Sequence, residues 1–257
     1  MTLLSLILLF LAGLLAGGVN ALAGGGSFIV FPALILAGVP IVVANATNTF
    51  AALPGYLSGA IGYWRHLKDH RGKLIPYTVT AAVGGYLGAE TLLRVSDAQF
   101  ALIVPWLMGL AVIAFAFGNR FNKWAASRSQ NLRGAQFAGM AAIGIMLIAV
   151  NFYGGFFNGG HGILLLAALA VAGMTDIHAM NGLKLLLSVF VASIAVARFG
   201  LSGSIAWLEG GAAFLGTLIG GYIAARMADR IPAQAIRTGI IIYALILTLI
   251  FFWQAYA

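Results

Sequence analysis

Two short glycine clusters are the residues of this 257-residue chain best suited to chemistry, and that chemistry is anion binding. The first cluster is Gly24-Gly25-Gly26-Ser27 and the second is Asn158-Gly159-Gly160-His161. About a dozen apolar residues follow each cluster. If those residues form a helix, its first N–H groups have no partner inside the helix and carry the positive end of its dipole. Glycine lets a ligand approach such groups, so both clusters are candidate anion sites; helix breaking or close packing alone is the alternative.

Lys184 is the one Lys or Arg that falls deep in a long apolar segment. A cation inside the hydrocarbon layer costs about 3 kcal/mol or more unless it is paired or hydrated, so such a residue is a functional candidate. A bound anion is one partner that would stabilise it. Asp176, the nearest acid in the sequence, or a backbone carbonyl is the alternative partner.

Neutral polar side chains just beyond the two apolar stretches are candidates for hydrogen bonds to the same anion. They are Asn45, Thr47 and Asn48 in the first half and Asn181 in the second. Interhelical hydrogen bonding is their alternative role. His161 has a side chain that titrates near neutral pH in water, so it is a candidate for coupling proton movement to anion movement, or for hydrogen bonding alone.

The composition indicates an integral membrane protein, and the elements of that protein must position these residues. Hydrophobic residues make up 62% of the chain and charged residues 8%, with a mean hydropathy of +1.01. A water-soluble domain would have too few polar side chains to cover its surface. The long apolar runs do not alternate, so they predict membrane-spanning helices and an all-α fold rather than barrel strands.

Several function classes are disfavoured by the same sequence. Much of the net charge of +8 lies in two short connectors between apolar runs, which indicates membrane topology rather than nucleic-acid binding. The chain has no Cys, which removes disulfides and thiolate metal sites. It contains no phosphate-binding loop and no serine-hydrolase or zinc-protease motif, so we expect no enzyme activity, cofactor or metal site.

The apolar segments occur in two similar sets, which predicts two tandem pseudo-symmetric repeats in a single transmembrane domain. An offset of 135 residues superposes Gly25 on Gly160, whereas an offset of 136 superposes Gly84-Gly85-Tyr86 on Gly220-Gly221-Tyr222. We place repeat 1 at about residues 1–119, a cytoplasmic linker at about 120–136 and repeat 2 at about 137–257. The eight expected spans are Leu3–Ala23, Val42–Trp64, Leu74–Leu93, Phe100–Gly118, Phe137–Phe157, His178–Arg198, Ile205–Ala225 and Gly239–Tyr256.

Two further apolar stretches, Ser27–Gly38 and Gly162–Gly173, are too short to cross a membrane. About twelve residues give roughly 18 Å of helix, against about 30 Å of hydrocarbon. Each is therefore expected to be a half-helix that begins inside the membrane. Its free backbone groups must face protein or a water-filled cavity.

Basic residues are concentrated in the connectors Arg65–Lys73 and Asn119–Gln136, which the positive-inside rule places in the cytoplasm. With four spans and one half-helix per repeat, this assignment predicts that both chain ends are cytoplasmic. An even number of spans also predicts that the two halves are parallel, related by an axis along the membrane normal. Arg94 and Arg226 are then expected on the opposite face.

The glycine, proline and polar positions resemble the pattern of the sulfite exporter TauE/SafE family, also called the toluene sulfonate uptake permease family. The resembling positions are Gly24-Gly25-Gly26, Pro32, Gly38, Pro40, Ala44, Thr47 and Asn48, then Asn158-Gly159-Gly160, Gly173, Ala179, Asn181, Gly182, Leu183 and Lys184. The resemblance covers nearly the whole chain. Ala167 stands where a proline is expected opposite Pro32, and His161 interrupts the glycine run.

The resemblance implies a secondary carrier for sulfur-containing anions such as sulfite, sulfoacetate or other sulfonates, in a bacterial inner membrane. Together with the anion sites above, it predicts a substrate held at both half-helix N-termini with Lys184, and alternating access by rocking of the two halves. The alternatives are an anion channel, a carrier of another small solute, or a non-transporting membrane scaffold subunit. The expected partners are the anion and the lipid bilayer, with no nucleic acid.

Overall fold

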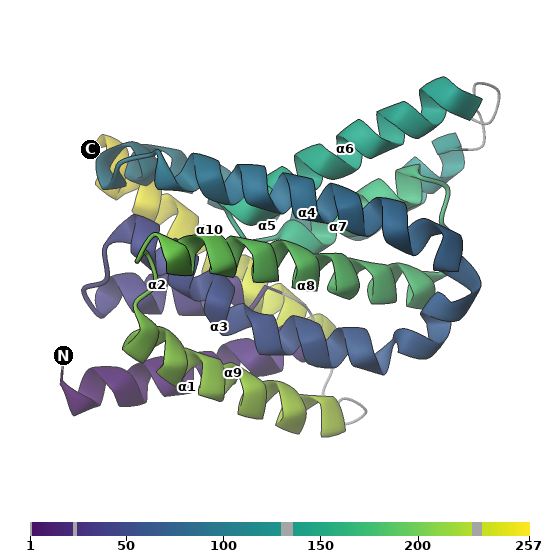
Figure 1. Cartoon of the computed structure of the whole chain (residues 1–257). Helices are drawn as coiled ribbons and strands as arrows, with labels where there is room; N and C mark the ends of the chain where they lie inside the picture. Colours follow the sequence, from purple (N-terminus) through teal and green to yellow (C-terminus); the bar gives the residue numbers. More distant parts are fainter. Residues whose placement is uncertain (1, 23–24, 130–135, 228–232) are drawn as a thin grey trace.

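Residues 2–22, 25–129, 136–227 and 233–257 are described by the computed structural model, and all regular structure among them is helical (Figure 1). The helices are α1 (Leu3–Leu22), α2 (Ser27–Leu36), α3 (Ile41–Gly62), η1 (Trp64–His70), α4 (Arg71–Leu93), α5 (Asp97–Ser129), α6 (Gln136–Phe156), α7 (His161–Val171), α8 (Ile177–Leu201), α9 (Trp207–Arg226) and α10 (Ala233–Tyr256). The predicted all-α membrane fold is confirmed, because the long helices match the expected spans and the short α2 and α7 match the expected half-helices.

Apolar sequence explains why the long helices suit a bilayer. Within the described residues, four segments have both the length and the hydropathy of a membrane span: Leu3–Ala21, Asp97–Gly118, Ile177–Leu201 and Thr238–Tyr256. The protein is therefore a multi-pass membrane protein. The less apolar α4 and α9 pack between other helices of the bundle, α4 against α6 and α8, and α9 against α1 and α3.

Glycines set the ends of both half-helices. α2 has 10 residues and α7 has 11, so each is roughly 15 Å long. Glycines with positive φ bracket both helices, namely Gly25 (93°), Gly38 (87°), Gly160 (78°) and Gly173 (80°). Other residues are strained in this conformation, so the chain turns where these glycines occur. Pro32 lies inside α2 whereas α7 contains no proline, so the Ala167 departure does not prevent the second half-helix.

The two halves are inverted, which corrects the prediction that they are parallel. α2 folds back beside α1, with Gly26 next to Ala16, so the two helices together return the chain toward the face where it began (Figure 1). The three helices α3, α4 and α5 then cross the bundle, and α6 begins on the opposite face. The prediction was wrong because it counted α1 as a complete crossing of the membrane. In the structure, α2 reverses that crossing.

Contacts between corresponding helices show the inversion directly. Trp106, in the first half of α5, donates its Nε1–H to the hydroxyl of Tyr256 at the end of α10, 3.0 Å away. The ring of Tyr63, just after α3, stacks on His178 near the start of α8, with ring centroids 6.3 Å apart. Corresponding helices thus meet start to end, as inverted repeats do.

The inversion also changes the expected sidedness. Both chain ends lie on the face opposite to the basic connector at η1 (Figure 1). The prediction that the chain ends share the face of the basic connectors was therefore wrong. If η1 is cytoplasmic by the positive-inside rule, the chain ends lie outside. Arg226 is corrected for the same reason, because α9 runs parallel to α1, with Thr217 beside Gly17, and ends toward the η1 face.

The alignment of the repeats shifts by one residue at each turn around the half-helices. α1 corresponds to α6 at an offset of 134, because Gly18 of α1 packs beside Ala224 of α9 as Phe152 of α6 packs beside Gly88 of α4. The bracketing glycines align α2 with α7 at an offset of 135.

The N-caps Pro40 and Asp176 align α3 with α8 at an offset of 136. Both offsets seen in the sequence are therefore correct, each for its own elements. Asn48 in α3 corresponds to Lys184 in α8.

Glycine at four-residue spacing lets helix pairs pack closely, as lipid-facing bundles require. Gly13 and Gly17 of α1 face the backbone of α9, and Gly84 and Gly88 of α4 face the backbone of α6. These two helix pairs correspond to each other under the inversion. These glycine spacings therefore mark the contacts between the halves.

Replacing Gly220 by Ala should destabilise the protein. A Cβ at Gly220 would lie 2.7 Å from the carbonyl carbon of Leu14, so α9 would have to move away from α1. Overpacking of this kind costs about 1–3 kcal/mol. Gly211 in the same helix has no atom within 4 Å of an added Cβ, so Gly211→Ala is the matched control. Thermal unfolding in detergent should show a lower melting temperature for the first variant alone; equal melting temperatures would contradict this account.

An ion pair joins the two halves near the face where the chain begins. Glu90 at the end of α4 accepts from Nε of Arg198 near the end of α8 at 2.7 Å, and from Nη2 of Arg94 at 3.0 Å. Side-chain exposures of 21% for Glu90 and 29% for Arg198 make the pair half-buried.

Candidate functional site

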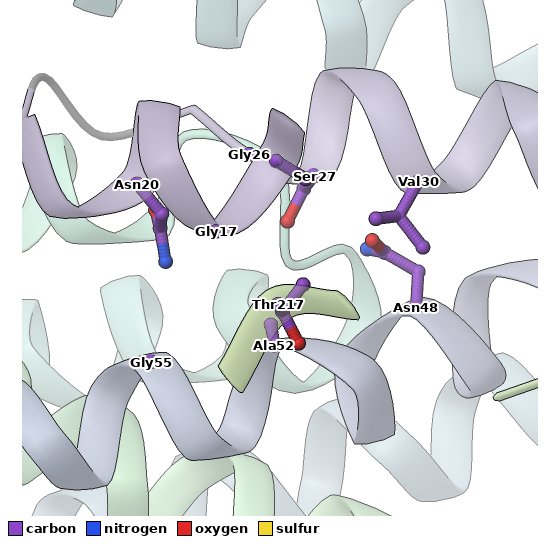
Figure 2. A pocket seen from close by; sticks show the side chains of 10 residues that line it. Gly17, Asn20, Gly26, Ser27, Val30, Asn48, Ala52, Gly55 and Thr217 are labelled. Carbon is purple, nitrogen blue, oxygen red and sulfur yellow. The ribbon is translucent and has the colours of Figure 1, made fainter. Parts of the chain in front are cut away.

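A small buried cavity lies at the N-terminus of α2, where the sequence predicts an anion site (Figure 2). Its volume is about 10 Å³, which is room for about one water molecule. The lining residues come from α1, α2, α3 and α9: Ala16, Gly17, Asn20, Gly26, Ser27, Val30, Asn48, Ala52, Gly55 and Thr217. Since α9 belongs to the second repeat, both halves of the protein form the cavity wall.

Asn48 directs a polar group into this cavity. Its side chain is 2% exposed, and its Oδ1 has no hydrogen-bond partner among the described residues. Figure 2 shows the amide extending from α3 toward Ser27 and Val30 of α2. A buried amide oxygen without a partner costs about 1–3 kcal/mol, so a water or a ligand group in the cavity would be stabilised.

Tyr56 links the two half-helix N-termini. Its hydroxyl donates to Oδ1 of Asn158, which precedes α7, at 3.0 Å, and lies close to Ser27 at the start of α2. Asn45 makes a second link, because its Nδ2 donates to the carbonyl of Phe156 at 2.8 Å. Oδ1 of Asn45 and Nδ2 of Asn158 have no partner in the described part of the chain. The interface between the halves thus contains several buried amide atoms available to a ligand.

His161 begins α7 and is enclosed by protein. Its ring is 1% exposed, with Nε2 3.2 Å from Oδ1 of Asn151 and Nδ1 3.5 Å from Oγ of Ser188. Gly154 lies against the ring, since a Cβ there would be 2.6 Å from its Cγ. An amide oxygen only accepts hydrogen bonds, so Nε2 carries the proton and Nδ1 accepts from Ser188. A neutral imidazole therefore satisfies every partner.

Lys184 extends across the first turn of α7. A Cβ at Gly162 would lie 3.3 Å from Cδ of Lys184, so the lysine stem covers this glycine. Its Nζ donates to Oδ1 of Asn181 at 3.0 Å. Among the described residues no carboxylate pairs with it. Lys184 is therefore a cation at a half-helix N-terminus whose protein partner is neutral.

Asp176 is not the partner of Lys184. It is the N-cap of α8 and accepts from the backbone N–H of His178 at 2.9 Å. This hydrogen bond lowers the pKa of the Asp176 carboxyl, as expected for a helix cap. The alternative in which Asp176 neutralises Lys184 therefore has no support in the geometry.

The structure separates the other predicted site residues into groups. Gly26, Ser27 and Asn48 line the cavity of repeat 1, whereas Gly159, Gly160, His161, Asn181 and Lys184 surround the start of α7. Gly25 does not line the cavity. Asn158 lies between the two groups. Gly24 falls outside the described residues. Thr47 does not line the cavity, because its Oγ1 accepts from the backbone N–H of Ala206 at the start of α9, 3.0 Å away.

The sequence prediction did not include several residues of the site, although the sequence pattern indicates some of them. Asn20, Asn151 and Thr217 are polar residues inside apolar runs, where any amide or hydroxyl has to find a partner. Tyr56 and Ser188 gave no such signal, since tyrosine and serine are ordinary residues of membrane helices. In the described part of the chain, no three His, Asp or Glu side chains are grouped as metal ligands would be.

The sequence was compared with known families and proteins. The model of the family described as "Sulfite exporter TauE/SafE" matches residues 9–251. The chain belongs to the TauE/SafE family. Curated relatives include a "Probable membrane transporter protein" of Haemophilus influenzae, 28% identical over 247 residues that cover 95% of this chain and 92% of the relative. Another is the "Probable membrane transporter protein YfcA" of Escherichia coli, 26% identical over 245 residues that cover 93% of this chain and 87% of the relative. No solved structure matches the chain.

Family membership establishes the general activity of this TauE/SafE protein as membrane transport. The half-helices and the buried amides between the halves are then features of a transporter. Such broken helices at mid-membrane depth commonly mark the binding site in transporters with inverted repeats.

Proposed function

We propose that this TauE/SafE protein is a secondary transporter of sulfur-containing anions such as sulfite, sulfoacetate or other organosulfonates. The anion binds at the half-helix N-termini of α2 and α7, between the two inverted halves. The observation that carries this proposal is the cation Lys184 at the start of α7, whose protein partner is the neutral Asn181. An oxyanion supplies the missing negative charge and accepts from Lys184 and from backbone N–H groups.

The cavity at α2 also limits how the anion binds. About 10 Å³ is less than the volume of a sulfite ion, so binding requires that α2 and α3 separate. Rocking of one inverted half against the other would produce this opening alternately toward the two faces. Of the amide atoms that lack partners in the present conformation, Nδ2 of Asn158 then donates to the anion, whereas Oδ1 of Asn45 and Oδ1 of Asn48 accept from bridging water.

His161 receives no proton-carrying role in this proposal. Its ring is enclosed, and the groups nearest its two nitrogens are the neutral Asn151 and Ser188. An anion channel or a carrier of another small solute is the alternative that shares this geometry. Counterflow in proteoliposomes separates them, because a carrier preloaded with unlabelled substrate transiently accumulates labelled substrate whereas a channel does not.

A ligand panel tests the substrate class. We expect sulfite or a sulfonate to raise the melting temperature of the detergent-purified protein, since a ligand at 100 times its Kd adds about 2.7 kcal/mol of stability. Sulfate, thiosulfate, taurine, sulfoacetate and simple carboxylates at equal ionic strength complete the panel, with chloride as the control. The chain has no Cys, so sulfite has no thiol or disulfide to react with. Absence of both a shift and counterflow for every sulfur anion would contradict the proposal.

A further inference from the structure

The two half-helix N-termini are not equivalent, although the repeats are related by inversion. The start of α2 leaves a cavity, whereas the start of α7 has the ring of His161 in the corresponding place. The offset of each helix pair shows which residues of the two sites correspond to one another. Gly26 of the cavity corresponds to His161 at an offset of 135.

The hydrogen-bond partners of the ring also correspond to cavity residues. At an offset of 134, Gly17 corresponds to Asn151, which lies 3.2 Å from Nε2. At an offset of 136, Ala52 corresponds to Ser188, which lies 3.5 Å from Nδ1. Both Gly17 and Ala52 line the cavity of repeat 1. Repeat 2 thus has His161, Asn151 and Ser188 where repeat 1 has Gly26, Gly17 and Ala52.

The space for the ring is provided in the same way. Gly154, which lies against the imidazole, corresponds at an offset of 134 to Asn20, which lines the cavity. An asparagine side chain at Gly154 would overlap the ring, since a Cβ alone would lie 2.6 Å from its Cγ. The four differences between the repeats are therefore mutually consistent. They add a side chain, give it two partners and remove the residue that would clash with it.

We propose that His161 is a built-in occupant of the second half-helix cavity, where its ring takes the space that the cavity at α2 leaves open in repeat 1. His161 is a positioning residue, because it fixes the start of α7 and the glycine on which Lys184 rests. The inference rests on the proposed function for its role in transport. The geometric part of the inference, that the cavity is shaped for an imidazole, does not rest on the proposed function.

Chemical rescue tests this inference without any anion. His161→Gly restores the residue type of repeat 1 and should lower the melting temperature by about 10 °C, because a ring-sized cavity and two unpaired polar groups remain. Added imidazole at millimolar concentration should recover about half of this loss or more by refilling the cavity. Wild-type protein, and a His161→Phe variant in which a ring already fills the space, should not respond to imidazole. Purification must avoid imidazole elution.

The outcomes separate this inference from the proposed function. Rescue of the glycine variant alone supports the built-in occupant, whatever the anion panel shows. If the glycine variant does not fold, imidazole in the growth medium should restore its yield while leaving the yield of the Phe variant unchanged. Failure of imidazole to raise either the melting temperature or the yield overturns the inference, as does an equal response of the Phe variant.

Discussion

Replacing Lys184 by Ala should abolish saturable anion transport while leaving the protein folded. The lysine stem lies on Gly162 at the first turn of α7, and its Nζ has the neutral Asn181 as its partner. Losing one member of a buried charge pair costs about 2–5 kcal/mol of binding free energy. This loss corresponds to at least about 30-fold weaker apparent affinity for the anion. Uptake of labelled sulfite or sulfonate into proteoliposomes measures it.

Two controls make the Lys184 experiment specific. Lys184→Arg keeps the charge and should keep measurable transport, although guanidinium geometry differs from that of an ammonium. Lys73→Ala removes a lysine near the start of α4 that is not among the residues around the start of α7, and should transport as the wild type does. Melting temperatures of all three variants show whether they are folded. Unchanged uptake by a folded Lys184→Ala protein would remove this residue from the proposed site.

Replacing Tyr56 by Phe should both destabilise the protein and impair transport. The change deletes only the hydroxyl, which donates to Asn158 before α7 and lies close to Ser27 of α2. Asn158 is 4% exposed and its Nδ2 already lacks a partner, so its Oδ1 would become a second unpaired buried atom. Such a loss costs about 1–3 kcal/mol.

Tyr86→Phe is the control for this change. Tyr86 is 46% exposed on α4 and its hydroxyl has no hydrogen bond among the described residues, so removing the hydroxyl should alter neither property. Thermal unfolding and proteoliposome uptake are measured side by side for both variants. If Tyr56→Phe matches Tyr86→Phe in both assays, the link between the half-helices has no role in holding the site together.

Local sequence was sufficient to predict the elements of this fold. Apolar length distinguished spans from half-helices, and the glycines Gly25, Gly38, Gly160 and Gly173 marked the turns because positive φ selects glycine. The position of Lys184 at a half-helix could also be predicted, since an isolated cation in an apolar run needs an explanation. These inferences succeed because each depends on a few consecutive residues.

Long-range geometry could not be predicted in the same way. Whether α2 reverses α1 depends on packing such as that of Gly26 on Ala16, which the sequence does not show, and the orientation of the second half follows from that reversal. Thr47 caps α9 from 159 residues away, so no local pattern could distinguish it from Asn48. The separate offsets for the three helix pairs could be determined only from the three-dimensional structure. With a single offset, His161 and its two hydrogen-bond partners could not all be aligned with the cavity residues of repeat 1.

In the proposed alternating-access cycle, the ion pair between Glu90 and Arg198 affects the balance between inward-open and outward-open forms. In inverted repeats, exchanging the conformations of the two halves converts one form into the other. The counterparts of Glu90 and Arg198 at an offset of 136 are Arg226 and Gly62, which cannot form an ion pair. The exchange therefore loses this contact without gaining an equivalent one, so the two forms differ in energy even without substrate. Because salt screens a half-buried pair less than an exposed one, this energy difference should persist at physiological ionic strength.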